Sequence, residues 1–190
     1  MRRIYAIALG LAVLLATPGL AGANPYATPA QRQQAIDYVI KRALSQRGVP
    51  FTYGGGDING PSLPPVREEP PTTGLSANNP DPLFPSLVTP AAPAAPKVAG
   101  FDASGLIVYA FGGVGIKMPR SSGEQYKVGR KVLPSQALPG DLIFYGPDGT
   151  QSVALFIGNG QMVGVTDTAV TVSPVRTNEM APYLSRIIEW

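Results

Sequence analysis

The chain contains neither cysteine nor histidine among its 190 residues. Without cysteine no disulfide can form, so the folded state must be stabilised by its core alone. Zinc sites built on cysteine or histidine are excluded, and the carboxylates show no spacing typical of a calcium-binding loop. A cysteine thiolate paired with an imidazole base is excluded too, because both groups are missing. We therefore expect no metal ion and no cofactor.

Positive charge is also scarce. Charged residues make up 14% of the chain, and the formal net charge is +3. Two of the positive charges, Arg2 and Arg3, stand at the N-terminus, and without them the net charge is +1. A nucleic-acid-binding surface needs clustered positive charge. The charge balance therefore argues against nucleic acid as a partner.

The N-terminus has the three parts of a secretory signal. Residues 1–3 are basic, residues 4–16 form an apolar run too short for a confident membrane span, and residues 21–23 are Ala-Gly-Ala. This pattern predicts a signal peptide over residues 1–23, followed by a single domain over residues 24–190. The secreted domain would have no stable membrane insertion after cleavage. An uncleaved N-terminal anchor is the alternative.

Helix signals come first along the chain and strand signals follow. The capping box that begins at Thr28 predicts a helix that stops at Gly48, and Asp102 is a good cap for a helix through about Gly112. Ser121 begins a second capping box, for a short helix ending at Gly129. Apolar runs predict strands over 141–145, 152–157, 161–165, 169–175 and 183–188. This order predicts an α+β fold with an antiparallel sheet.

Residues 57–99 differ in composition from the rest of the chain. They hold 11 of its 21 prolines and show no helical or strand period. Such composition favours a disordered or loosely docked insertion. A long segment of this kind inside a domain can instead be a functional flap.

Several ordered motifs surround this insertion. Phe101–Leu106 reads Phe-Asp-Ala-Ser-Gly-Leu, which looks like a cysteine-peptidase nucleophile motif without its sulfur. The other motifs are at 50–55, 118–122, 138–144, 151–153 and 157–162. Together they make residues 30–190 resemble the NlpC/P60 family of cell-wall peptidases, especially its mycobacterial Rip-type members, which include a non-catalytic one. The resemblance implies a papain-like fold, with N-terminal helices packed on a mainly antiparallel sheet.

The resemblance also locates the catalytic positions. In active members a cysteine begins a helix, a histidine begins a strand opposite, and a glutamate on the next strand orients the imidazole. These positions correspond to Ala103, Ser152 and Gly164, so the chain departs from the family at all three. Three losses together indicate a natural pseudoenzyme and not a single-site trap variant. A hydrolase using Ser104 or Ser152 would lack a base.

What the resemblance leaves is a groove for the stem peptides of peptidoglycan. Its predicted ligand-binding residues are Tyr53, Asp102, Ser104, Arg120 and Ser121. Each except Ser104 also has a purely structural interpretation. Tyr53 could be a packing aromatic, Asp102 and Ser121 could be helix caps, and Arg120 could be a solvated charge.

The sequence thus predicts a secreted, non-catalytic domain that binds peptidoglycan in the cell wall or periplasmic space. The alternative is a protein-interaction pseudoenzyme. It would regulate active cell-wall hydrolases or scaffold division partners, with the proline-rich insertion as the contact surface.

Overall fold

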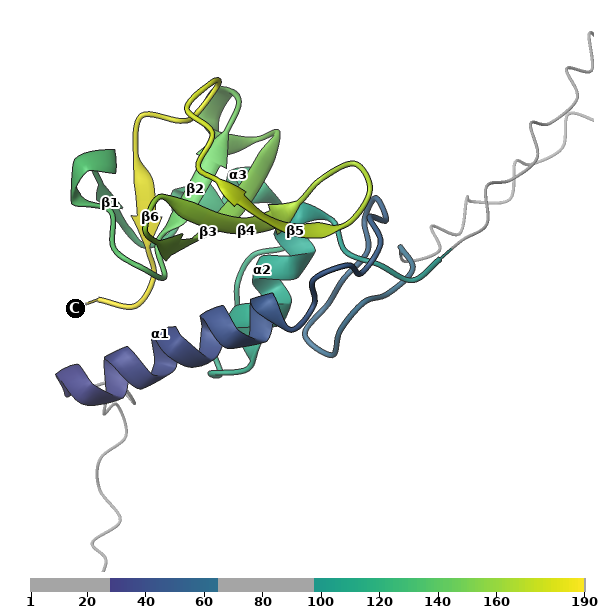
Figure 1. The fold of residues 1–190 in the computed structure, drawn as a ribbon, viewed down its shortest axis with the longest axis horizontal. Coiled ribbons are helices and arrows are strands. Elements are labelled where there is room, and N and C mark those ends of the chain that lie inside the picture. The colour runs from purple at the N-terminus through teal and green to yellow at the C-terminus, as the bar shows by residue number, and fades with distance from the viewer. Residues whose placement is uncertain (1–27, 65–97, 190) are drawn as a thin grey trace, which may run out of the picture.

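The computed structural model describes residues 28–64 and 98–189, and they form an α+β domain (Figure 1). The predicted signal peptide and most of the proline-rich insertion lie outside the described residues. The helices are α1 (Pro29–Leu44), α2 (Ala103–Gly112) and α3 (Ser122–Lys127). The strands are β1 (Arg130–Val132), β2 (Leu142–Tyr145), β3 (Ser152–Gly158), β4 (Gln161–Val165), β5 (Val170–Pro174) and β6 (Leu184–Arg186), with short 3-10 turns at Pro134–Gln136 and Pro147–Gly149.

Helix α1 begins as its sequence predicts. The Thr28 side chain accepts a hydrogen bond from the Gln31 backbone, and the Gln31 side chain accepts one from the Thr28 backbone. Pro29 occupies the first turn, where its missing N–H costs nothing. The buried face consists of Ala35, Ile36, Val39 and Ala43. This face packs on α2, which lies between α1 and the sheet (Figure 1).

The sheet is antiparallel throughout, with the strand order β1-β6-β2-β3-β4-β5. Its helix-facing side contributes Phe144, Val153 and Leu155 to the main core, together with α1 and α2. The opposite side carries a smaller cluster that includes Tyr145 and Met162 and contains no helix residue. Among the described residues, no helix is both long and apolar enough to cross a membrane.

The predicted α+β class is confirmed, and the main differences lie at the ends of elements. Helix α1 ends four residues before Gly48, and α3 ends two residues before Gly129, which adopts a positive φ of 77°. Strand β1 and the 3-10 turn after it were not predicted, because three residues are too few to show a period. The predicted hairpin at 158–160 is present between β3 and β4.

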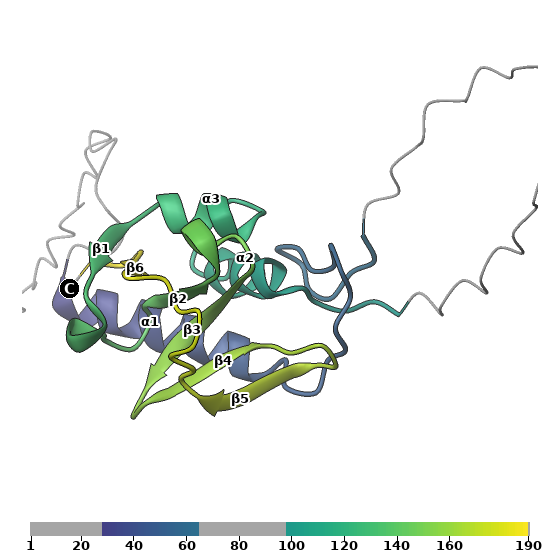
Figure 2. The same ribbon diagram turned by 90° about the horizontal axis from the view of Figure 1, so that it is seen from above.

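The two ends of the insertion meet at the edge of the domain. Ser62 and Gly100 form an antiparallel bridge, and the Thr52 hydroxyl donates to the Val98 carbonyl at 2.6 Å. A Cβ at Gly100 would overlap the carbonyl oxygen of Pro50, so glycine is required there. Figure 2 shows the chain leaving and re-entering the domain on the same side. Residues 57–64, at the start of the predicted disordered or loosely docked insertion, are thus held against the domain, while most of the predicted insertion lies outside the described residues.

Candidate functional site

A groove of about 1190 Å³ lies where the N-terminus of α2 faces the start of β3. It is bounded by the glycine turn after Phe51, by the β4–β5 loop and by the segment after β5. The groove brings together most of the residues that the sequence singled out: Tyr53, Asp102, Ala103, Ser104, Arg120, Ser121 and Ser152. Gly164 does not line it.

Ala103 is the first residue of α2. Asp102 caps the helix by accepting a hydrogen bond from the Gly105 backbone N–H at 2.6 Å. The N-terminus of a helix carries partial positive charge, which would stabilise a thiolate at this position. Here the position presents only a methyl group to the groove, with no atom that can attack a carbonyl.

Arg120 is the residue that fixes this helix end. Its two terminal nitrogens donate to the two Asp102 carboxylate oxygens, Nη1 at 2.8 Å and Nη2 at 2.9 Å. Nη1 also donates to the Ser104 hydroxyl at 2.8 Å, and Nη2 to the Gly55 carbonyl at 3.0 Å. Both terminal nitrogens are thus engaged inside the protein, which leaves little capacity for a ligand carboxylate.

The other predicted contact residues differ in availability. The Ser104 side chain is buried, and its hydroxyl donates to Asp102 at 3.1 Å. Ser121 caps α3, accepting from the Glu124 backbone at 3.4 Å and donating to the Glu124 carboxylate at 2.8 Å. Tyr53 is 84% exposed at the groove wall, so its ring is available for a ligand.

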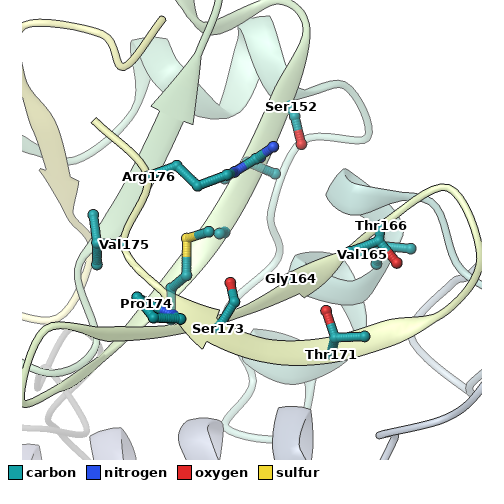
Figure 3. A pocket seen from close by; sticks show the side chains of 12 residues that line it. Ser152, Gly164, Val165, Thr166, Thr171, Ser173, Pro174, Val175 and Arg176 are labelled. Atoms are coloured by element: carbon teal, nitrogen blue, oxygen red, sulfur yellow. The ribbon is translucent and has the colours of Figure 1, made fainter. Parts of the chain in front are cut away.

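A second hollow of about 390 Å³ continues from the groove over β3, β4 and β5. It is lined by Ser152 and Gly164, and it shares Val165, Val175 and Arg176 with the groove, so the two spaces adjoin. Gly164 pairs with Ala154 across the strands. Side chains alternate along a strand, so Ser152 lies on the same sheet face as Ala154, and both line the hollow, in which Figure 3 labels Ser152 and Gly164. Ala103, Ser152 and Gly164, the three positions predicted to be degenerate, therefore border one continuous space.

Two side chains at this junction were missed by sequence reasoning. Tyr145 is buried, and its hydroxyl donates to the Arg176 carbonyl at 3.2 Å and lies 3.2 Å from the Met162 sulfur. The Arg176 guanidinium lies over the Tyr145 ring, 4.5 Å from its centroid. Burial raises the pKa of Tyr145 and the Arg176 charge partly opposes the rise, so the phenol is neutral at pH 7. The sequence signal that could have pointed to them was the position of Arg176, directly after the predicted strand 169–175.

Acidic residues also reach the groove from its loops. Asp167 belongs to the β4–β5 loop, and Glu179 follows β5 with a positive φ of 58°. Among the described residues, no group of three or more Asp, Glu, His or Cys side chains could hold a metal ion. The described lining of the groove offers hydroxyls, backbone groups and a few charged side chains.

The NlpC/P60 family profile matches residues 48–189. The chain belongs to the NlpC/P60 family. It is 42% identical over 189 residues to the peptidoglycan endopeptidase RipB of Mycobacterium tuberculosis, covering 95% of this chain and 67% of RipB. It is 43% identical over 160 residues to the peptidoglycan endopeptidase RipA of that species, covering 83% of this chain and 28% of RipA.

Two solved structures of mycobacterial domains are more similar in sequence. RipD of M. tuberculosis, a non-catalytic NlpC/P60 domain protein adapted to peptidoglycan binding, is 54% identical, with a TM-score of 0.62 over 82% of this chain and 98% of that one. The P60 domain of an M. avium paratuberculosis antigen is 53% identical, with a TM-score of 0.63 over 82% of this chain and 95% of that one. The family and fold predictions are therefore confirmed.

The spacing of three residues in RipA bears on the degenerate positions. RipA structures include variants altered at a cysteine, at a histidine 49 residues later and at a glutamate 12 residues after that. In this chain Ser152 follows Ala103 by 49 residues, and Gly164 follows Ser152 by 12. The two sets of positions have the same spacing.

Proposed function

We propose that this protein is secreted, binds peptidoglycan in the cell envelope and does not cleave it. The observation that carries the proposal is the identity of three residues that border the continuous space formed by the groove and the second hollow. Ala103, Ser152 and Gly164 border it, at the spacing of a cysteine, a histidine and a glutamate in RipA. They supply an alanine, a serine and a glycine instead.

Hydrolysis through another residue has little chemical support. A serine hydroxyl needs a base to remove its proton, and no histidine exists in the chain. Arginine stays protonated, so neither Arg120 nor Arg176 can be that base. Neither Lys117 nor Lys127 lines the groove. Loss of a triad nucleophile costs on the order of 10⁶ in rate in a measured peptidase.

Several features of the groove, by contrast, support ligand binding. The described residues enclose a groove of about 1190 Å³, Tyr53 offers an exposed ring at its wall, and Asp102 with Arg120 keeps the α2 end in place. The likeness to RipD, which is described as adapted to peptidoglycan binding, supports the same role.

The test is co-sedimentation of the protein with insoluble peptidoglycan, with mass spectrometry of the soluble fraction from the same tubes. We expect the protein in the pellet and no new muropeptides in solution. New muropeptides that persist after repurification of the protein would overturn the non-catalytic assignment. A protein that stays in solution would overturn peptidoglycan binding.

A pair of tyrosine variants locates the binding surface. Tyr53→Ala removes an exposed groove ring, whereas Tyr183→Ala removes a ring that is 44% exposed and lines neither hollow. We expect only Tyr53→Ala to reduce sedimentation. If neither variant matters but replacement of residues 65–97 by a short glycine-serine link abolishes sedimentation, the interaction belongs to the insertion. Peptidoglycan binding would then stand, with the insertion and not the groove as its contact surface.

A further inference from the structure

We propose that Arg176 and the 390 Å³ hollow beside it form a subsite for a carboxylate group of the bound peptide. This inference rests on the proposed function, since the ligand reaches the hollow from the groove. The subsite would lie where an active relative carries its base and orienting glutamate, and it would turn a lost catalytic space into a binding space.

The lining of the hollow suits one anionic group. Among the described residues that line it, Arg176 is the one charged side chain. Hydroxyl groups of Ser152, Thr171 and Ser173 also line it, and Figure 3 shows Arg176 extending across the space toward Ser152. A guanidinium with neighbouring hydroxyl donors is the set of groups that recognises a carboxylate.

Arg176 is available for this role, and Arg120 is not. No carboxylate of the described residues lies within ion-pair distance of Arg176, whereas Arg120 already pairs with Asp102. Packing over the Tyr145 ring holds the Arg176 guanidinium in place. A cation fixed in this way loses less freedom when a ligand binds.

Because position 164 is a glycine, it supplies no internal carboxylate to pair with Arg176, and a ligand would have to provide one. A glutamate at this position, as the RipA spacing indicates for that relative, would place a carboxylate in the hollow that Arg176 lines. Glycine adds no side chain, so both the space and the charge of Arg176 are open to a ligand. The carboxylate of the peptide would take the place of the missing internal one.

The experiment compares two synthetic stem peptides by calorimetry with the full mature chain. One has free carboxylates, and in the other these are converted to carboxamides. We expect the wild type to bind the free acid about 2- to 5-fold more tightly, the range for a solvent-exposed charge pair. Arg176→Ala should lose most of this preference. Arg47→Ala, which removes an exposed arginine outside both hollows, should keep it.

A second pair of variants tests the same idea without touching Arg176. Gly164→Glu supplies an internal carboxylate, and Gly164→Gln is its neutral counterpart of equal size. Both introduce a Cβ 3.1 Å from the Ala154 Cβ, so any steric cost is common to the two. We expect Gly164→Glu to bind the free-acid peptide at least about 2-fold more weakly than Gly164→Gln, by the same charge argument.

The outcomes separate the subsite from the proposed function. Equal affinity of the wild type for both peptides, an acid preference that survives Arg176→Ala, or equal binding by the two Gly164 variants overturns the subsite. Sedimentation with insoluble peptidoglycan but no binding of either peptide also overturns it, while peptidoglycan binding stands. Absence of both sedimentation and peptide binding overturns both.

Discussion

Arg120 and Asp102, which both line the groove, form a bidentate ion pair with nitrogen–oxygen distances of 2.8 and 2.9 Å. The pair ties the segment before α3 to the first turn of α2, and the Gly54 backbone adds a further hydrogen bond to Asp102 at 3.1 Å. The arrangement sets the shape of the groove beside Ala103, which we propose stands at the nucleophile position of active relatives.

Loss of this pair should weaken both the fold and the binding of peptidoglycan. Arg120→Ala should cost about 1–2 kcal/mol of unfolding free energy, a figure already discounted because the Arg120 side chain is 43% exposed. The matched control is Arg130→Ala, which removes a single exposed contact of 3.0 Å with Glu189 and should cost at most about 0.5 kcal/mol. Urea denaturation measures both values, and equal costs would contradict the bridging role of Arg120.

The buried pair between Arg186 and Asp141 should respond much more strongly. The two side chains are 7% and 1% exposed, and their oxygen–nitrogen contacts are 2.7 and 2.8 Å. Asp141→Asn leaves a buried cation without its partner, so we expect a loss of about 3–5 kcal/mol in urea denaturation. A loss below about 1 kcal/mol would mean that water or the nearby Gln136 carbonyl compensates the charge.

Ala103→Cys alone should not restore hydrolysis, although it returns a thiol to the N-terminus of α2. Without an imidazole at Ser152, no base can accept its proton. Muropeptide release, followed by mass spectrometry, should stay at the wild-type background. The triple variant Ala103→Cys, Ser152→His and Gly164→Glu should release more than the single one. Cleavage by the single variant would show that the base has been assigned wrongly.

Tyr145 should make stability fall at alkaline pH. Burial raises the pKa of Tyr145 above the ordinary value of 10.0, so its neutral form favours the folded state. Stability from this effect is complete below pH 10 and is lost as the pH rises through the higher pKa of the folded state. Between pH 9 and pH 11 the unfolding free energy of Tyr145→Phe should therefore decline less than that of the wild type. Parallel declines in urea denaturation would contradict the assignment.

Local signals predicted a large part of the site. The caps Asp102 and Ser121 could be read from the sequence, because each acts on a backbone N–H three residues away. The hairpin before Gln161 was equally local. The positions of Ala103, Ser152 and Gly164 came from a motif resemblance, and the structure brings all three to the border of one space.

The partners of the two arginines could not be predicted in the same way. Arg120 contacts residues 18 and 65 positions earlier in the chain, and such contacts leave no periodic trace in the sequence. Arg176 stands in a segment without a motif, and its position depends on the Tyr145 ring across the sheet edge. Sequence reasoning therefore named Arg120 as a ligand-binding residue, whereas the structure engages Arg120 inside the protein and the proposed carboxylate subsite uses Arg176.

The bridge between Ser62 and Gly100 holds the two ends of the proline-rich insertion side by side. Since its two ends are already fixed side by side, each doubling of its length would cost only about 0.6 kcal/mol of closure entropy. We therefore expect the groove to keep its geometry when the length or sequence of the insertion changes. A fluorescent label or an epitope inserted there would leave the sequence of the described groove residues unchanged, and its effect on sedimentation with peptidoglycan would report on the insertion itself.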